Sequence, residues 1–357
     1  MAYTTIDDPS IYFQTALYTG STSSVTVTND GNSNLQPDWL WIKSRSSTTS
    51  HDAFDSSRGI TSKRLFPNLT NAEDSNGVAS VTSNGFTTGT TLGNINNNGD
   101  TYVAWQWKAN GGTTSSNNDG SYTSTVQANT TAGFSIVKYG DATSFSSSSP
   151  ATVGHGLGKA PKWIIIKNLD GTRSWGVHHA GLTSAGKIIY LDLTNTEADS
   201  SGFMNSTAPS STVFTVNTLN VANGNNLEYI AYCFAEIQGY SKFGSYEGND
   251  ATDGPFVYTG FKPAWVMIKH ISGSAGGTKN WYMYDNKRSP QNVNDNTLIA
   301  NGNDAEGADS AFDIDMLSNG FKIRNSEGAI NNAASYIYMA FAEHPFVSSK
   351  GVPVTAE

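Results

Sequence analysis

Three glutamates recur at corresponding places in this 357-residue chain and are its best candidates for acid–base chemistry. Glu73, Glu197 and Glu306 each lie shortly after an asparagine in a polar stretch. A glycosidase needs two carboxyl groups about 5–10 Å apart in a cleft. Three identical catalytic centres in one chain would be unusual, so we favour a structural role in which each glutamate satisfies a turn or pairs with Lys or Arg. We therefore expect no catalytic residue and no enzyme.

Two further groups have ligand-like chemistry. His178 and His179 are adjacent, but neighbouring residues on a strand point to opposite faces and cannot share one metal without a bend. The stretch 30–34 alternates oxygen-bearing side chains as a calcium loop does, yet it lacks the Gly at position six and the Glu at position twelve. We expect a turn there, leave calcium binding open, and expect neither another metal site nor a cofactor.

Trp175 and Trp281 are the candidate ligand-binding residues. Each follows a polar loop rich in Gly, Ser or Thr, at residues 170–174 and 272–278. A tryptophan at the rim of a sheet could stack on a sugar, although the core is the more common place for an indole ring. The loops themselves have the Asn, Ser, Thr and Tyr composition of adaptable recognition surfaces.

Composition excludes several classes of protein. Charged residues make up 14% of the chain and the formal net charge is −9, so no basic stripe is present to neutralise nucleic-acid phosphates. The first residues, MAYTTIDDPS, lack a signal-peptide pattern, and no apolar run is long enough to insert in a membrane. The single cysteine, Cys233, lies in an apolar run and reads as a small buried hydrophobe in a protein made in a reducing compartment.

A repeat organises the chain. The pattern P-x-W-φ-φ-I-K, in which φ is apolar, occurs at residues 37–43, 161–167 and 263–269. A second marker begins at Tyr102, Tyr229 and Tyr336, which lie 65, 68 and 73 residues after the proline of each pattern. Near-equal intervals indicate that whole units repeat. The sequence predicts an N-terminal arm (1–10), repeat 1 (11–109), a flexible polar linker (110–132), repeat 2 (133–239), repeat 3 (240–347) and a C-terminal tail (348–357).

The repeated segments predict an all-β fold. They are short, rich in β-branched and aromatic residues, and bounded by Gly, Asn, Asp and Pro. In the first pattern Trp39 and Trp41 fall on one face and Leu40 and Ile42 on the other, which is typical of a central strand covered on both sides. About 100 residues with six or seven strands match a two-sheet sandwich, and we expect three tandem sandwiches of jelly-roll type.

These motifs carry a resemblance. Together with Ile6–Ser10 and Tyr12–Thr15, the repeated strand, its Tyr-x-Gly turn, the Ser-Asn-Gly-Phe step and the closing Tyr-Ile-Ala strand resemble a family of virion proteins of marine tailed bacteriophages. Each repeat is more weakly similar to concanavalin-like and laminin-G-type jelly rolls. The resemblance implies a particle component made in the host cytoplasm, with other virion proteins as partners. Residues 1–10 could dock it to the particle, with Tyr12 and Phe13 as the candidate docking residues.

Three functions follow from this resemblance and from the composition. The first is a non-enzymatic structural protein on the particle surface, of the tail-fibre or appendage type, which could adhere to a host-surface glycan. The second is a capsid decoration protein, and the third, ranked last, is a polysaccharide-degrading enzyme. We expect a homo-oligomer that binds no nucleic acid and inserts in no membrane. The chain lacks heptads and collagen repeats, which weakens the long-fibre version of the first function.

Overall fold

A computed structural model of the protein describes residues 3–90, 93–273, 278–308 and 310–354. Antiparallel β-sheets dominate, so the all-β prediction is confirmed. The α-helices within those ranges are single turns, at α1 (Gly93–Asn96), α2 (Ser201–Met204) and α3 (Gly328–Asn331). Two 3-10 turns, η1 (Pro9–Ile11) and η2 (Ser310–Phe312), complete the helical segments.

Three units follow one another along the chain, and each contains a large sheet. Unit 1 has the order β1-β7-β3-β4, unit 2 has β15-β14-β13-β12-β17-β10-β9-β8, and unit 3 has β18-β26-β20-β21-β22-β23. In unit 1 the strands are β1 (Phe13–Thr19), β3 (Trp39–Ser44), β4 (Asp52–Asp55) and β7 (Thr101–Trp107). In unit 2 they are β8 (Ser115–Asn117), β9 (Ser124–Asn129), β10 (Phe134–Gly140), β12 (Trp163–Asn168), β13 (Gly176–His179), β14 (Lys187–Tyr190), β15 (Ala198–Asp199) and β17 (Glu228–Phe234). In unit 3 they are β18 (Ser241–Glu247), β20 (Phe261–Gly273), β21 (Trp281–Asp285), β22 (Asn296–Ile299), β23 (Gly307–Ala308) and β26 (Ala334–Pro345).

A smaller sheet covers each large one. The small sheets are β2-β6-β5 in unit 1, β11-β16 in unit 2 and β19-β25-β24 in unit 3. Their strands are β2 (Thr26–Thr28), β5 (Ser80–Thr82), β6 (Gly85–Thr87), β11 (Ala151–Gly154), β16 (Val213–Val216), β19 (Phe256–Tyr258), β24 (Ile314–Leu317) and β25 (Gly320–Ile323). In unit 3, for example, Phe321 of the small sheet and Ile268 of the large sheet belong to one buried cluster. Each unit is therefore a two-layer sandwich with its own core.

The repeated P-x-W-φ-φ-I-K strand is central in every large sheet, as predicted. All six residues of β3 are buried, because both faces of the strand are covered. Trp39 and Trp41 face a cluster shared by the three units, whereas Leu40 and Ile42 face the core of unit 1. The equivalent strands β12 and β20 divide their side chains in the same way.

The stretch 110–132 differs from the predicted flexible linker. It contains β8 and β9, and β9 pairs with β10 from Ser124 to Asn129, which extends the large sheet of unit 2. The Gly, Ser, Thr and Asn composition of this stretch favours a linker, but a polar segment can still add to an existing sheet edge. Gln127 is fully buried there and donates hydrogen bonds to the hydroxyls of Ser56 and Ser57 in unit 1.

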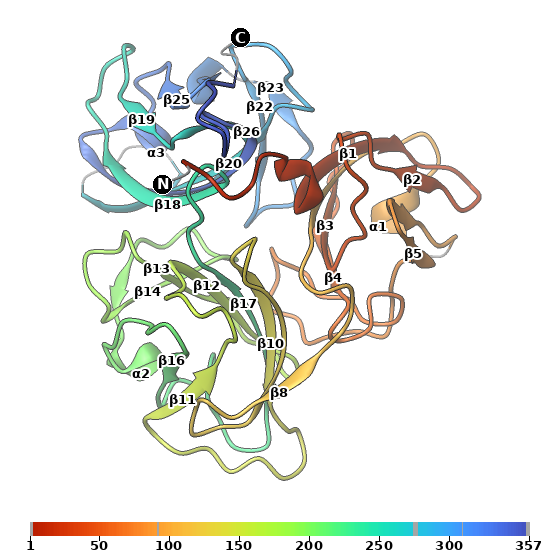
Figure 1. The fold of residues 1–357 in the computed structure, drawn as a ribbon, viewed down its shortest axis with the longest axis vertical. Coiled ribbons are helices and arrows are strands. Elements are labelled where there is room, and N and C mark those ends of the chain that lie inside the picture. The colour runs from red at the N-terminus through yellow and green to blue at the C-terminus, as the bar shows by residue number, and fades with distance from the viewer. Residues whose placement is uncertain (1–2, 91–92, 274–277, 309, 355–357) are drawn as a thin grey trace.

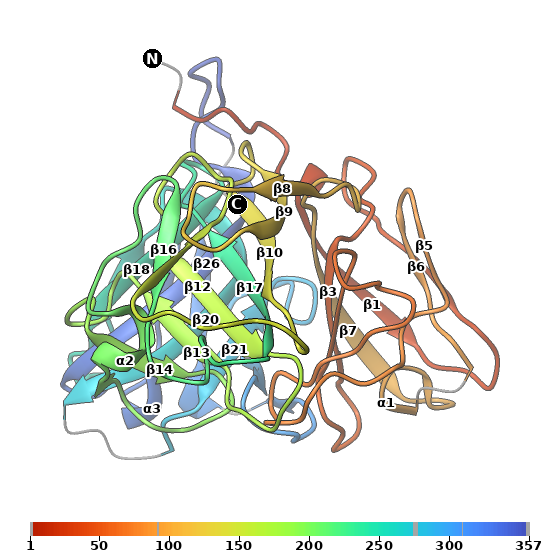
Figure 2. The same ribbon diagram turned by 90° about the horizontal axis from the view of Figure 1, so that it is seen from below.

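The units form a closed ring. Figure 1 shows three lobes around a common centre, with unit 1 on the right, unit 2 below and unit 3 at the upper left. The large sheets face the centre and the small sheets lie outside. In Figure 2, residues 3–8 and the hairpin at 346–354 project together from one end of the molecule, while α1 and α3 lie toward the other end.

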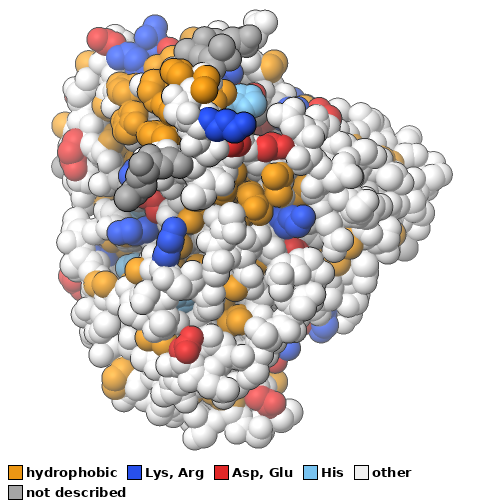
Figure 3. Space-filling model, viewed as in Figure 1, with side chains coloured by type: hydrophobic (Ala, Val, Ile, Leu, Met, Phe, Trp, Pro, Cys, Tyr) orange, Lys and Arg blue, Asp and Glu red, His pale blue; other side chains and the backbone are white. Residues whose placement is uncertain are grey.

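The surface agrees with the low charge of the chain. On the face shown in Figure 3, charged side chains are scattered, and the largest group of hydrophobic side chains lies on the upper-left lobe, which is unit 3. Isolated surface hydrophobes are ordinary, but a group of them on one lobe is a candidate contact surface.

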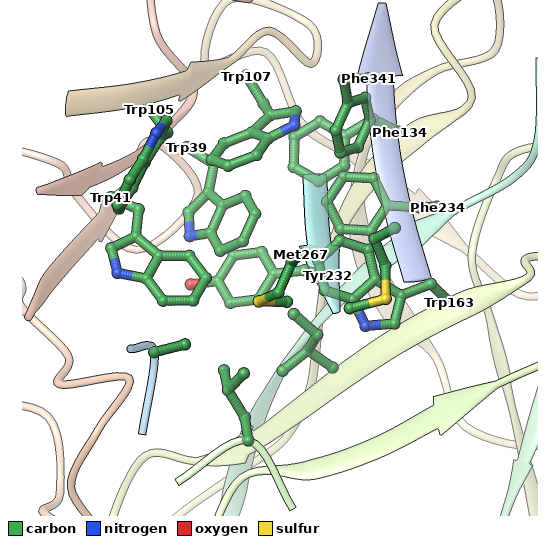
Figure 4. Close-up of a cluster of buried hydrophobic side chains, with 14 of the residues drawn as sticks. Trp39, Trp41, Trp105, Trp107, Phe134, Trp163, Tyr232, Phe234, Met267 and Phe341 are labelled. Carbon is green, nitrogen blue, oxygen red and sulfur yellow. The ribbon is translucent and has the colours of Figure 1, made fainter. Parts of the chain in front are cut away.

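A shared aromatic core holds the ring together (Figure 4). Trp39 of unit 1 stacks on Tyr232 of unit 2, with ring centroids 4.6 Å apart. Trp107 of unit 1 meets Trp265 of unit 3 edge-on at 5.8 Å, and Phe341 of unit 3 lies 5.7 Å from Phe234 of unit 2. Aromatic pairs add about 0.5–1.5 kcal/mol each beyond the burial of their area. No unit could bury these faces by itself, so each unit depends on the other two for part of its buried surface.

Candidate functional site

The recurring glutamates lie at the three interfaces of the ring. The backbone N–H of Glu73 donates to the Leu169 carbonyl at 2.9 Å, which joins unit 1 to unit 2. The backbone N–H of Glu197 donates to the Ile271 carbonyl at 3.0 Å, and the backbone N–H of Glu306 donates to the Arg45 carbonyl at 2.8 Å. Each acceptor is the second residue after the lysine of the repeat pattern. The glutamates therefore recur because the interface recurs, and the structure places each at a different interface rather than in one cleft.

Their side chains are engaged as well. The Glu73 carboxylate accepts from Arg58 at 2.8 Å and forms an ion pair with Lys63 at 2.6 Å. Glu306 pairs with Arg45 at 2.7 Å and with Arg288 at 3.1 Å. Glu197 instead accepts from the backbone N–H of Thr183 at 2.9 Å and from its hydroxyl. A carboxylate held by such partners connects structural elements and is not free to act as an acid or a base.

Trp175 and Trp281 do not form open platforms in this structure. Both side chains are fully buried in the shared core. The indole N–H of Trp175 donates to the Phe66 carbonyl at 3.0 Å, and that of Trp281 donates to the Tyr190 carbonyl at 2.9 Å. The polar loops before them suggested a rim position, but the rings turn inward because the neighbouring unit covers them. Residues 274–277 of the second loop lie outside the described part of the chain.

His51 occupies the same place in unit 1, and the sequence interpretation missed it. It lies twelve residues after Trp39, as Trp175 lies twelve after Trp163. Its Nε2 is 3.0 Å from the Ile299 carbonyl of unit 3, so a ring N–H from this position or from the equivalent tryptophan crosses each interface. The equal spacing was the available signal, but a change of residue type from Trp to His concealed it.

A buried polar network strengthens two of the three interfaces. Asp55 pairs with Arg58 at 2.5 Å and accepts from the Tyr232 hydroxyl of unit 2 at 2.7 Å. At the equivalent place in unit 3, the carboxylate of Asp285 pairs with Arg288 at 2.5 Å, and it accepts from the indole N–H of Trp105 of unit 1 at 3.0 Å. These charges are fully buried, so each depends on the other for compensation.

The third interface replaces the whole network at once. Unit 2 has His179 where the other units have Asp, and Leu182 where they have Arg. The position that corresponds to Tyr232 and Trp105 is Met339, which has no N–H or O–H donor in its side chain. His179 instead places Nε2 3.2 Å from the Tyr338 carbonyl of unit 3. The Asp, the Arg and the hydrogen-bond donor are therefore all absent from this interface. This is expected, because a buried charge without its partner would be costly.

His178 and His179 do not form a metal site. Both rings are buried, and burial lowers the pKa of His178 to about 4 and that of His179 to about 3. Across the described part of the chain, no cluster of three or more His, Cys, Asp or Glu side chains has the arrangement of a metal site. Asp30, in the stretch considered as a calcium loop, pairs with Lys287 at 2.9 Å.

The lysines of the repeat pattern are buried at the same interfaces. Burial lowers the pKa of Lys43 and Lys167 to about 8 and that of Lys269 to about 7. Their ammonium groups donate to backbone carbonyls, and two of these belong to the preceding unit: Lys167 donates to Thr70 at 3.2 Å and Lys269 to Thr194 at 3.1 Å. The repeated Lys is therefore an interface residue.

The candidate docking residues lie in different settings. Phe13 is buried among Trp107, Trp265 and Phe341, so its ring is part of the core. Tyr12 is half-buried, with its ring centroid 6.0 Å from that of Tyr240. Of this pair, Tyr12 is the one that keeps a surface a partner could touch.

The N-terminal arm is fastened to unit 3 over its described residues, 3–10. The Tyr3 hydroxyl donates to the Gly260 carbonyl at 2.8 Å and lies 3.1 Å from that of Tyr258. Ile6 is buried in the shared core. Asp7 accepts from the Ser349 backbone N–H at 2.6 Å, which links the arm to the C-terminal hairpin. The arm and the hairpin therefore form one projecting end.

A cleft of about 190 Å³ lies between units 1 and 3 beside this end. Six of its lining residues carry side-chain amide, carboxylate or ammonium groups: Gln14, Asp30, Asn32, Asn286, Lys287 and Glu343. Both carboxylates are in ion pairs, Asp30 with Lys287 and Glu343 with Lys262. Such a lining can bind a polar ligand through hydrogen bonds, and it holds no free pair of acids for hydrolysis.

Comparison with known proteins identifies the family. A model described as "Domain of unknown function (DUF7483)" matches residues 8–345, so the chain belongs to that family. No curated protein and no solved structure matches the chain. Among the described residues, the structure has no helix with the length and apolar character needed to cross a membrane.

Proposed function

We propose that this protein is a non-enzymatic structural protein of the virion surface, of the tail-fibre or appendage type. The observation that carries the proposal is the architecture of the molecule: a ring of three sandwiches with a shared core, whose two described ends project from the same side (Figure 2). A shared core suits a globular surface protein that must resist unfolding outside the cell. The motif resemblance to virion proteins of marine tailed bacteriophages supports the same role, and the two-layer units support, as part of this proposal, kinship with concanavalin-like jelly rolls.

In this proposal the projecting end attaches to other virion proteins. It combines the arm, the C-terminal hairpin, half-buried Tyr12 and the polar cleft between units 1 and 3. The opposite end, with its polar loops around α1 and α3, then faces outward and could adhere to a host-surface glycan. The protein would be made in the host cytoplasm and would assemble as a homo-oligomer on the particle, without binding nucleic acid or inserting in a membrane.

Locating the protein in purified particles tests the proposal. Antibody labelling or a density map should place it on the surface of the tail, with the arm toward the particle. A position on the capsid would favour capsid decoration, an alternative that the same shared-core architecture also suits. Absence from the particle would remove both roles.

A deletion tests the attachment end. Removing residues 1–5 leaves Ile6 in the core but deletes the contacts of Tyr3 with unit 3. Incorporation into virions should fall, while the melting temperature of the isolated protein should change by only a few degrees. Unchanged incorporation would show that the arm does not attach the protein. Binding to a glycan array without turnover would separate adhesion from the enzymatic alternative.

A further inference from the structure

The outer strand of unit 3 differs from its counterparts. β19 lies at the edge of its sheet, with Phe256 45% and Tyr258 52% exposed on one face. Its pairing opposite Phe321 aligns it with β2 of unit 1, opposite Phe86, and with β11 of unit 2, opposite Phe214. The positions of the two aromatic residues are taken by Thr26 and Thr28 in unit 1 and by Thr152 and Gly154 in unit 2.

In unit 2 the chain itself covers this edge. The turn between β8 and β9 runs along β11, with Tyr122 and Val153 forming a parallel bridge. The Tyr122 N–H donates to the Thr152 carbonyl at 3.0 Å, and the Thr152 N–H donates to the Ser121 hydroxyl at 2.8 Å. The Ser124 hydroxyl donates to the Gly154 carbonyl at 2.7 Å. An extended polypeptide is therefore the natural cover for this edge of the fold.

In unit 3 the same edge stays open. The backbone N–H of Ile323 donates to the Pro255 carbonyl, and that of Thr259 donates to the Asn319 carbonyl. The backbone groups of alternate residues in and beside β19 therefore point toward β25. The backbone N–H and C=O of Phe256 and Tyr258 therefore face away from the sheet. The Tyr338 hydroxyl lies 3.5 Å from the Tyr258 carbonyl, and we find no partner for the other three groups among the described residues. Native proteins usually protect such an edge.

We propose that β19 binds an extended segment of another polypeptide by strand addition, with its side chains packed on Phe256 and Tyr258. Main-chain hydrogen bonds supply affinity in this mode, and the side-chain contacts supply specificity. The exposed Asp250 and Asp253 precede the strand, and Lys322 neutralises one of them. The bound segment should therefore carry a Lys or Arg at the end that meets residues 250–253. This inference does not depend on the virion role.

A tethered probe tests the site in the full-length chain. The probe copies residues 119–125, which cover the edge in unit 2, with Asp119→Lys to complement the acidic loop. It is joined after Glu357 by a Gly/Ser linker of about 20 residues, which raises its local concentration to the millimolar range. Hydrogen exchange of the segment 254–260 should slow at least tenfold relative to the chain that carries the linker alone. Equal exchange in the two proteins would overturn the proposal.

Three variants locate the effect. Tyr258→Pro removes an outward N–H that β25 does not use, as edge strands tolerate, and it should abolish the protection of this segment. Thr28→Pro makes the matched change in unit 1 and should leave the protection unchanged. Replacing Phe256 and Tyr258 by Thr, the residues of unit 1, keeps the edge and should weaken protection about fivefold. Protection of this segment by bacterial surface oligosaccharides but not by the probe would mark a glycan-binding surface and refute strand addition.

Discussion

Buried histidines show how single residues set the response of this protein to pH. Nδ1 of His51 accepts from the Trp41 indole N–H at 2.8 Å, so Nε2 carries the proton that points to Ile299. Nδ1 of His179 accepts from the Gly181 N–H at 2.9 Å, with Nε2 toward Tyr338. Both rings use their hydrogen bonds fully as neutral imidazoles. A proton on Nδ1 would break a bond as well as bury a charge.

Acid should therefore destabilise the fold through these rings. Burial lowers the pKa of His51 to about 3, against 6.5 for a free histidine. Between these values the unfolded chain binds the proton and the folded chain does not, so stability falls as the pH drops below 6.5, by about 1.4 kcal/mol per pH unit. Urea unfolding at pH 7.5 and 5.0 should show that the loss is about 2 kcal/mol smaller in His51→Gln than in the wild type.

The comparison with the variant matters because another buried group acts in the opposite sense. Burial raises the pKa of Asp52 to about 6, so its protonation favours the folded state as the pH falls from 6 toward 3.8. The total pH dependence is a sum of such terms, and the difference between wild type and His51→Gln removes the shared ones. Equal losses in the two proteins would contradict the role given to His51.

At the scale of elements, the interfaces are exchangeable sets of residues. Two interfaces use Asp, Arg and an aromatic donor, and the third uses His179, Leu182 and Met339. The elements that carry them, the β4, β13 and β21 strands with the turns that follow, keep the same register against the repeated strand. The backbone pairing is thus the same at all three interfaces, whereas the set of polar side chains differs as a whole between the third interface and the other two.

This interpretation predicts the outcome of partial and fuller replacement. Arg288→Leu leaves the Asp285 carboxylate buried without its cation and should cost about 3–5 kcal/mol of unfolding free energy. Adding Asp285→Asn removes the stranded charge, so the double variant should recover at least half of that loss. Chemical denaturation of the wild type and the two variants measures both steps. A double variant as unstable as the single one would show that charge compensation is not what links the two residues.

At the scale of the whole molecule, the shared core makes the three units interdependent. Trp39, Trp107 and Phe341 each pack against an aromatic ring of another unit, so each loses part of its covering when that unit is removed. Each interface is also crossed by a backbone bond from a recurring glutamate and by a ring N–H. Cooperative unfolding of the ring as a single body follows from this arrangement.

Calorimetry can test that cooperativity. The full chain should show one transition with equal calorimetric and van't Hoff enthalpies. A chain ending at residue 239, which lacks unit 3, should fail to reach a native state because it exposes Trp107 and other residues of the shared core that pack against unit 3. Three separate transitions, or a stable truncated chain with native tryptophan fluorescence, would show instead that the units are independent sandwiches.

The sequence by itself determined the repeat, the all-β class and the central place of the P-x-W-φ-φ-I-K strand. These features are local: an apolar pattern on both faces of a short segment identifies a strand covered on both sides, whatever covers it. The same patterns could not show what the covering was. Trp175 and Trp281 follow polar loops, which is compatible with a position at the rim of a sheet. They are buried because a neighbouring unit covers each of them and accepts a hydrogen bond from its indole N–H.

Tertiary structure decided the relations between units. Glu73, Glu197 and Glu306 have similar sequence surroundings. Only the arrangement of the three units shows that the backbone N–H of each glutamate bonds to the next unit, and that Glu306 of unit 3 bonds back to unit 1. Residues 110–132 have the composition of a linker, yet an open sheet edge nearby made strands of β8 and β9. Composition reports the preference of a segment alone, whereas edges, interfaces and shared cores depend on residues that are far apart in the chain.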